Sequence, residues 1–488
     1  MTFVSIHAVH MAAPRVKHKH RQASPPRRKP DARSEARPDA RPDTRPDARP
    51  QAVPAKRRAA LPPLVSHPQA RARQLAAWVL EQVLFEQQAL LNLWPRIDPE
   101  TRERALVRSI VFASLRELEP LRALLQSRLS KPLGDDKRAQ EARLLTALAE
   151  LFFLSQSPQA MVVTSAVDAA PTPLKGLVNA VLRRALDAEA DSRAILEKTP
   201  RLPDWLRKRW QEAYGAKTLS DILAALHGSA PLDLTFVTPA DQTSAEQAPL
   251  APWSQRFTET RNPLEIPAFR SGQAFVQDLA ASLPVAMLPS LNGKRVLDLC
   301  AAPGGKTVQL LSAGAEVVAL DRSAPRLAHL RDNLARMQFT AEVIEADALE
   351  YSDALGFDIV VLDAPCSATG TIRRHPDLPY VRKRERLLQF LPLQQRLLAK
   401  AFSLVRPGGQ LLYAVCSLEV EEGERQIETF LSQTRDAKRA RPLAPPPPGL
   451  EMTRTRAGFL RTLPSMRRSE GGMDGFFAAV LEKRQRDA

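Results

Sequence analysis

The chain has 488 residues and carries 70 Lys and Arg against 54 Asp and Glu, which gives a formal net charge of +16. Its apolar content of 44% is typical of a globular protein and excludes disorder throughout the chain. The longest apolar run, Leu144–Leu154, contains Glu150 and is too short for a transmembrane helix, which needs about 20 residues. The length predicts about three domains.

The excess positive charge is concentrated at the N-terminus. Residues 1–70 hold 15 Lys and Arg against 5 Asp and Glu, together with 12 of the 42 prolines. The segment 37–50 reads RPDARPDTRPDARP, and its prolines and alternating charges neither propagate a helix nor bury apolar surface. We therefore expect residues 1–70 to be a disordered basic tail. Two interpretations stay open: an arm that contacts nucleic-acid phosphates, and a solvated extension that has no partner.

The three cysteines are Cys300, Cys366 and Cys416, which lie 66 and 50 residues apart. This spacing is typical neither of a disulfide framework nor of a zinc site, and it favours a reducing compartment. The N-terminal residues also lack the basic-then-apolar order of a secretion signal. The sequence therefore predicts a cytoplasmic protein with no membrane segment and no bound metal.

A helical pattern begins near residue 71. Apolar residues recur at four-residue steps in Leu75, Val79 and Val83, and Asp98 followed by Pro99 predicts a helix start. Because no strand-like alternation intervenes, residues 71–190 are predicted to form an all-helical domain of five or more helices. The further helical patterns are the face formed by Leu106, Ile110 and Ala113, the segment Ala142–Leu154 and the segment Leu174–Leu186.

Residues 191–270 are predicted to form a connecting subdomain. Trp205, Trp210 and Tyr214 indicate a small packed helical unit, and a short helix is expected over Ser220–His227. The segment Leu232–Val237 is typical of a strand.

From residue 271 to residue 488, strands alternate with helices. This alternation predicts a doubly wound, mostly parallel sheet. The expected strands are Arg295–Leu299, Glu316–Leu320, Glu342–Ala346, Asp358–Leu362 and Gln410–Val415. The expected helices run from the turn after the first strand through Leu311, then over Ala324–Met337, over Arg386–Leu404, closed by Pro407-Gly408-Gly409, and over Glu421–Gln433.

Each expected strand is followed by a side chain that can take part in chemistry. In a doubly wound sheet, ligands bind at the carboxyl ends of the strands. We therefore expect the acids and thiols at these ends to converge on one site. They are Asp298, Cys300, Asp321, Asp347, Asp363 and Cys416.

The segment Cys300–Lys306, CAAPGGK, joins the first strand to a helix. Its glycines let the backbone approach a ligand closely, and the helix start offers free N–H groups. The spacing is neither the dinucleotide fingerprint nor the P-loop, so a pyrophosphate or triphosphate ligand is not favoured. An acid such as Asp321, at the end of the second strand, commonly binds ribose hydroxyls. Together these features favour a nucleoside without phosphates, such as S-adenosylmethionine; the alternative is a structural turn beside an exposed Asp.

Cysteines follow the fourth and fifth strands, in DAPCSATG at Asp363–Gly370 and LYAVCS at Leu412–Ser417. A lone cysteine is usually an inert small side chain. Two thiols at adjacent strand ends, beside an acid and a nucleoside pocket, favour covalent chemistry. A thiolate that adds to C6 of a pyrimidine makes C5 able to attack a methyl sulfonium. Asp363 is expected to hold N3 of the base, and the residues alone leave open which thiol attacks.

Several segments carry a resemblance to a known family. Cys300–Lys306 with the preceding Asp298, DAPCSATGTIRRHPD at Asp363–Asp377, and AVCS at Ala414–Ser417 resemble the RNA 5-methylcytosine methyltransferase (NOL/NOP/Sun) family. KGLVNAVLRR at Lys175–Arg184 resembles the NusB-type RNA-binding domain of its bacterial Sun/RsmB-type branch, the 16S ribosomal RNA cytosine-C5 methyltransferases. The resemblance extends over residues 71–488 and includes DGFFAAVLEK at Asp474–Lys483, which fits the domain's last strands.

The resemblance implies a Rossmann-like class I methyltransferase domain over residues 271–488, preceded by an all-α NusB-like domain over residues 71–190. It implies methyl transfer from S-adenosylmethionine to C5 of a cytosine in 16S ribosomal RNA, with Cys416 as nucleophile and Cys366 assisting product release. Asp321 would hold the ribose of S-adenosylmethionine, Asp347 would lie by its adenine, and Asp363 would line the site. The loop residues that would bind it are Cys300, Ala301, Ala302, Pro303, Gly304, Gly305 and Lys306.

The target cytosine has to be unpaired, because the thiol approaches C6 from above the ring. Candidate phosphate contacts follow the Cys366 loop, and an ordinary solvated basic helix start is the alternative. Two rival functions stay open: a transfer RNA methyltransferase with the same chemistry, and a non-catalytic RNA-binding or assembly factor. The candidate contacts are Arg373, Arg374, His375 and 382–386, with Arg102, Arg104, Arg108 and Arg116 in the helical domain.

Removal of the tail is expected to weaken RNA binding without abolishing methylation, because every predicted site residue follows it. A chain that begins near Leu64 should bind RNA less tightly and with a shallower salt dependence, since it loses basic residues near phosphates. Methylation assays over a range of salt concentrations, with the full chain as control, measure both effects. Loss of all activity in the shortened chain would contradict this expectation.

Overall fold

The computed structural model describes residues 60–63, 68–97, 103–154, 157–226, 229–238, 247–257, 262–382, 387–440, 449–455 and 457–485. The predicted basic tail lies almost entirely outside the described residues. So do Asp98 and Pro99, the predicted helix start, and 383–386 of the basic run.

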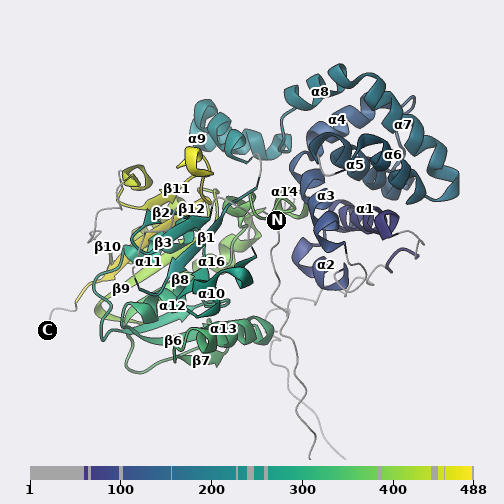
Figure 1. The fold of residues 1–488 in the computed structure, drawn as a ribbon. Helices are drawn as coiled ribbons and strands as arrows, with labels where there is room; N and C mark the ends of the chain where they lie inside the picture. The colour runs from purple at the N-terminus through teal and green to yellow at the C-terminus, as the bar shows by residue number, and fades with distance from the viewer. Residues whose placement is uncertain are drawn as a thin grey trace, which may run out of the picture. The chain divides into compact units, whose positions relative to one another are not determined.

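The first part of the described chain is helical (Figure 1), as the sequence predicts. Leu75, Val79 and Val83 of α1 are fully buried, which confirms that they form its packing face. In α3 the predicted face is confirmed at Ile110, which is buried, but Leu106 and Ala113 are only half-buried, whereas Val107 is buried. The helices are α1 (Pro68–Glu86), α2 (Leu90–Ile97), α3 (Arg104–Arg116), α4 (Leu118–Arg128), α5 (Arg138–Phe153), α6 (Gln159–Asp168), α7 (Lys175–Asp187), α8 (Glu189–Lys198) and α9 (Asp204–Ala225).

Helix α9 contains a break at Gly215, whose φ of 79° and ψ of 163° are accessible to glycine but not to most residues. The predicted short helix at 220–227 corresponds to the part of α9 after this break, which begins before Ser220 and ends at Ala225; His227 lies outside the described residues. Trp210 from the first half is fully buried in a cluster with Leu418. The helix is therefore attached to the loop that follows the last parallel strand.

A small antiparallel sheet follows α9. Its strand order is β2-β3-β1-β4, and only β1 is predicted by the sequence. The strands are β1 (Leu232–Phe236), β2 (Gln247–Ala251), β3 (Ser254–Phe257) and β4 (Ala274–Val276), and the short helix α10 (Pro267–Arg270) precedes β4. Strands β2 and β3 are only five and four residues long, and neither shows a clear alternation of apolar and polar residues.

The large sheet confirms the predicted doubly wound architecture. Its strand order is β10-β12-β9-β8-β5-β6-β7, with β11 paired to β12. Strands β5 to β9 all run parallel to one another, whereas β12 runs antiparallel to β9. The strands are β5 (Arg295–Leu299), β6 (Glu316–Asp321), β7 (Glu342–Glu345), β8 (Phe357–Asp363), β9 (Val405–Val415), β10 (Ala437–Arg439), β11 (Leu460–Thr462) and β12 (Phe476–Lys483).

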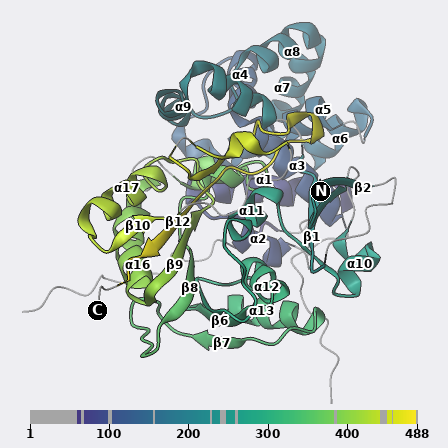
Figure 2. The ribbon, with the colours of Figure 1, turned by 90° about the vertical axis from the view of Figure 1, so that its left-hand side faces the viewer.

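Helices cover both faces of this sheet, because successive strand residues point to opposite sides. Leu297 packs in one buried cluster with Leu397 of α16, and Val296 packs in another with Leu283 of α11. Figure 2 shows α12 and α13 beside β6 and β7, and α16 beside β9. The helices are α11 (Leu279–Ala286), α12 (Gly305–Ser312), α13 (Ala324–Arg336), α14 (Leu378–Val381), α16 (Leu391–Ser403) and α17 (Glu424–Gln433).

Several helix boundaries differ from the prediction: α16 begins at Leu391 and α17 at Glu424, each later than expected. Pro407, Gly408 and Gly409 do not close a helix but lie within β9, which begins at Val405. The register between β8 and β9 shifts after the Phe357–Val405 pair, and such an irregularity tolerates a proline in a strand.

Candidate active site

The carboxyl ends of β5, β6, β8 and β9 meet at one edge of the sheet, as the sequence predicts. Asp321 ends β6 and is buried, and Asp363 ends β8 and is half-buried. Cys416 directly follows β9, and Cys300 directly follows β5. Asp347 follows β7, is exposed, and accepts a hydrogen bond from the Leu349 amide at 2.9 Å.

The loop Cys300–Lys306 turns sharply into α12. Cys300 has a φ of 60° and Gly304 a φ of 106°, and the Ala302–Pro303 peptide is cis. A Cβ on Gly304 would lie 3.1 Å from the Leu330 side chain, so both the backbone angle and the packing favour glycine there. The loop therefore presents its backbone, and the free amides of the helix start, at the end of β5.

Asp321 is held in place by this loop and by the start of the next one. Its carboxylate accepts hydrogen bonds from the Ala302 amide at 3.3 Å and the Ser323 amide at 3.0 Å, and Arg326 Nη1 lies 3.2 Å from it. A fixed, buried carboxylate can accept hydrogen bonds from ribose hydroxyls, and the glycine-containing loop beside it lets a nucleoside approach closely. The geometry thus fits the nucleoside part of S-adenosylmethionine.

Two groups below the loop are protected from solvent. Burial raises the pKa of Asp298 to about 7, although Thr307 Oγ1 donates a hydrogen bond to it at 2.6 Å. Burial, with the nearby charges of Asp321 and Asp363, raises the pKa of the Cys300 thiol to about 12. Cys300 is therefore a neutral thiol at physiological pH and is unsuited to act as a nucleophile.

The other two thiols are in contact. Cys366 Sγ lies 3.6 Å from Cys416 Sγ, and both side chains are half-buried. The hydrogen bond to Cys416 and burial raise the pKa of Cys366 well above its ordinary value. Either sulfur can donate in this contact, and the raised pKa keeps Cys366 in its S–H form.

Lys306 reaches with its side chain from the loop to the end of β8. Its side chain is 7% exposed, its Nζ donates to Asp363 Oδ2 at 2.7 Å, and it lies 4.9 Å from the centre of the Phe476 ring. The sequence places Lys306 with the cofactor residues, and its pairing with Asp363 was not predicted. The pair sets a cation and a carboxylate in contact at the end of β8.

A buried polar network around the thiol loops was also not predicted. Glu422 accepts hydrogen bonds from the amide and hydroxyl of Ser367, and Arg461 Nη1 donates to the Ser417 carbonyl at 2.6 Å. Glu419 accepts from Trp210 Nε1 at 3.0 Å. The acidic run at 419–424, directly after Cys416, is the only sequence signal that points to this network.

The prediction that Arg373 and Arg374 contact phosphates is wrong. Arg373 is 2% exposed, and both guanidinium groups bind the buried carboxylates of Asp278 and Asp474 at 2.5 to 3.3 Å. Burial alone would raise the pKa of Asp278, but the two arginines hold it below its ordinary value. Buried charges require such partners, so these arginines attach the Cys366 loop to its surroundings. Of the other candidates, His375 is exposed.

The candidate arginines of the helical domain differ from one another in their exposure to solvent. Arg108 is 6% exposed, with its guanidinium 5.3 Å from the centre of the Trp94 ring, so the prediction of a phosphate contact is wrong for it. Arg104 is exposed, Arg116 is half-buried, and Arg102 lies outside the described residues.

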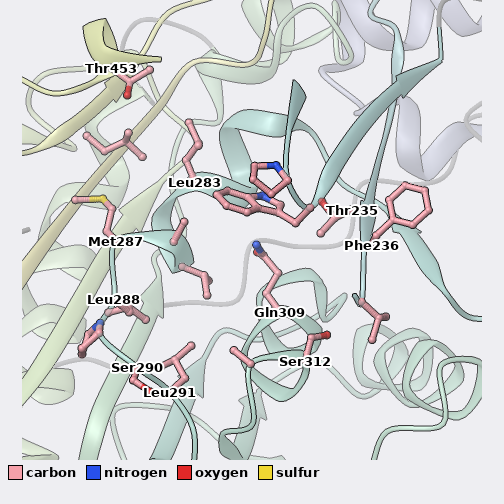
Figure 3. Close-up of a pocket in the computed structure, with 18 of the residues that line it drawn as sticks. Thr235, Phe236, Leu283, Met287, Leu288, Ser290, Leu291, Gln309, Ser312 and Thr453 are labelled. Carbon is pink, nitrogen blue, oxygen red and sulfur yellow. The ribbon is translucent and has the colours of Figure 1, made fainter. Parts of the chain in front are cut away.

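A cavity of about 720 Å³ lies elsewhere (Figure 3). Leu283, Met287, Leu288 and Leu291 give it apolar walls, and Gln309 and Ser312 enter from α12. It contains none of the predicted site residues. Among the described residues no group of three side chains could hold a metal ion, and none of the helices has the length and hydropathy of a membrane span.

Comparison with known proteins supports the same reading. A family model described as 16S rRNA methyltransferase RsmB/F matches residues 285–482, and one described as NusB family matches residues 70–187. Ribosomal RNA small subunit methyltransferase B of Pasteurella multocida is 35% identical over 441 residues, covering 84% of this chain and 96% of that protein. The chain belongs to the 16S rRNA methyltransferase RsmB/F family. The predicted family is thus confirmed, and members of this family are S-adenosylmethionine-dependent enzymes.

Other relatives agree. The protein of the same name from Vibrio cholerae is 35% identical over 439 residues, covering 84% of this chain and 97% of that protein. The crystal structure of PH0851 has a TM-score of 0.63 at 24% identity and covers 86% of this chain and 100% of its own. NSun6 from Pyrococcus horikoshii with SFG has a TM-score of 0.50 at 19% identity and covers 58% of this chain and 99% of its own. The two structures confirm the fold.

Replacement of Arg374 by Ala is expected to destabilise the methyltransferase domain. The change leaves Asp278 and Asp474 with one buried cation fewer, which should lower the free energy of unfolding by roughly 3–5 kcal/mol. Urea denaturation measures this. The control is Arg406→Ala, which removes a 52% exposed partner of Asp358 and should cost less than about 1 kcal/mol. Equal stability of the two variants would contradict a structural role for Arg374.

Proposed function

We propose that this enzyme methylates C5 of a cytosine in 16S ribosomal RNA in the cytoplasm, through a covalent adduct between Cys416 and C6. The observation that carries the proposal is the 3.6 Å contact between the Cys366 and Cys416 sulfurs beside the Lys306–Asp363 pair. The names of its relatives support the RNA substrate.

The cofactor residues in this proposal are those at the ends of β5, β6 and β7. S-adenosylmethionine supplies an electrophilic methyl group on a sulfonium when it is bound. Asp321, fixed by two backbone amides, would accept hydrogen bonds from ribose hydroxyls, and Asp347 would lie by the adenine. The backbone of Cys300–Lys306 would form the wall against which the cofactor lies.

Cys416 begins the reaction as a thiolate that adds to C6, so that an S–C6 bond forms and the C5=C6 electrons move onto C5. Asp363 in its protonated form would donate its proton to N3, and the Lys306 ammonium would face O2, so that the negative charge developing on the ring is neutralised. The electron-rich C5 would then take the methyl group, and the electron pair of the broken S–CH3 bond would stay on the sulfonium sulfur, which leaves as a neutral thioether. Cys416 carries the base covalently during this transfer.

Release reverses the addition. The C5 proton passes to water, the C5=C6 bond forms again, and the electron pair of the S–C6 bond returns to Cys416. The Cys366 S–H lies where it can donate a hydrogen bond to the departing sulfur. We propose this as the way in which Cys366 assists release.

We further propose that the NusB-like helical domain, residues 71–190, binds the RNA. It carries exposed basic side chains such as Arg104. The target cytosine has to leave its stack to reach Cys416, which favours an unpaired or extruded base.

The two thiols should give opposite phenotypes when they are replaced. Cys416→Ala should abolish methyl transfer, because no adduct forms. Cys366→Ala should form the adduct and retain it, because the leaving sulfur loses its donor. Methyl incorporation into 16S RNA and denaturing gel electrophoresis of the protein–RNA complex measure the two steps. Full turnover by Cys416→Ala would contradict the proposal, and a Cys366→Ala variant that turns over without an adduct would contradict the release role.

A further inference from the structure

Glu422 is the most completely buried carboxylate near the thiols. It lies six residues after Cys416, between β9 and α17, and is 0% exposed. Among the residues that the structure describes, it forms no ion pair; its partners are neutral donors. A buried carboxylate without a cation costs free energy. The hydrogen bonds that its oxygens accept therefore explain why this carboxylate is buried here.

The oxygens of Glu422 hold the residue after Cys366. Oε1 accepts from the Ser367 amide at 2.9 Å, and Oε2 accepts from the Ser367 hydroxyl at 2.5 Å. Oε1 also accepts from Gln394 Nε2 at 3.2 Å, and the same Nε2 donates to the Pro365 carbonyl at 2.8 Å. The backbone on both sides of Cys366 is thus fixed by Glu422 and its neighbour Gln394.

Glu422 is itself anchored to the strand and loop that carry Cys416. The Tyr413 hydroxyl, on β9, donates to the Glu422 carbonyl at 2.8 Å. Ser367 Oγ lies 3.1 Å from Ser417 Oγ, so the residues that follow the two cysteines are in contact. Both connections keep the Cys366 loop against the Cys416 loop.

The surroundings of Cys366 favour the same arrangement. Its hydrogen bond with Cys416 and its burial raise the pKa of the Cys366 thiol, and Glu422 makes a smaller contribution because burial raises the pKa of Glu422 as well. Cys366 is thereby kept as an S–H donor.

We infer that Glu422 is a positioning residue for product release, holding the loop that presents the Cys366 S–H to the Cys416 sulfur. The inference rests on the proposed function, in which Cys416 forms the adduct and Cys366 helps it to leave. It adds a residue that makes no contact with either substrate and acts through Cys366.

The test compares Glu422→Gln with Cys366→Ala and with Glu482→Gln. Gln has the size of Glu, but its amide nitrogen cannot accept the hydrogen bond from Ser367. The control makes the same substitution at a surface residue of β12, where Glu482 pairs with Lys438 at 2.9 Å. Each variant is incubated with 16S RNA and radiolabelled S-adenosylmethionine. The first methyl transfer, the steady-state rate and the fraction of protein in a denaturation-resistant RNA complex are then measured.

Glu422→Gln should accumulate the covalent complex as Cys366→Ala does. Its first methyl transfer should stay near that of the unaltered enzyme, while its steady-state rate falls on the order of 10²-fold, as expected for a catalytic group displaced by about 1 Å. Glu482→Gln should behave like the unaltered enzyme. This pattern separates positioning from general destabilisation, which would reduce the first transfer as well.

Two results would overturn the inference. If Cys366→Ala accumulates the complex and Glu422→Gln turns over without it, or loses the first transfer, Glu422 has no specific part in release and the proposed function stands. If Cys366→Ala accumulates no complex, the release role itself fails, and the inference fails with it. Should Glu422→Gln not fold, Ser367→Ala decides instead, because this change removes the hydroxyl that donates to Glu422. The Ser367→Ala variant should also accumulate the covalent complex, and a Ser367→Ala variant without the complex would overturn the inference.

Discussion

The parallel pairing of β8 with β9 determines how close the two reactive thiols lie. Asp363 is opposite Ala414 in this register, so Cys366 comes three residues after one member of the pair and Cys416 two residues after the other. Backbone hydrogen bonds continue past the strands, from the Ala364 amide to Ala414 at 2.9 Å and from the Gly370 amide to Cys416 at 3.1 Å. A slip of one residue would turn every side chain to the opposite face and separate the thiols.

Strand pairing alone does not hold loops of this kind, and buried polar groups complete the site. Arg461 on β11 binds the Ser417 carbonyl and the carboxylate of Glu424, so an antiparallel strand far along the chain supports the loop that follows Cys416. On the other side, Arg373 and Arg374 attach the Cys366 loop to Asp278, the N-cap of α11. A buried polar group that lost its hydrogen-bond partner would cost free energy, so these contacts make the arrangement rigid.

The sequence predicts those parts of the fold that depend on local patterns. The strands Arg295–Leu299 and Asp358–Leu362 are short apolar runs, and CAAPGGK has the residues of a tight turn, so their places are confirmed. Glu422 and Arg461 could not be assigned, because their partners lie 55 and 44 residues away and no periodic pattern marks such pairs. Arg373 looks like a surface base in the sequence, and only its contacts with Asp278 and Asp474 show that it is buried. Propensity and spacing describe elements, whereas burial of a charge depends on which elements meet.

The central claim is that Cys416, not Cys366, bonds to the cytosine. RNA in which the target cytosine carries fluorine at C5 tests it most directly, because the adduct cannot lose a C5 proton and stays attached. Digestion of the trapped complex and mass spectrometry of the cross-linked peptide identify the modified residue. The structure predicts the nucleotide on the peptide that contains Cys416. A nucleotide attached to Cys366 would contradict the assignment of both thiols.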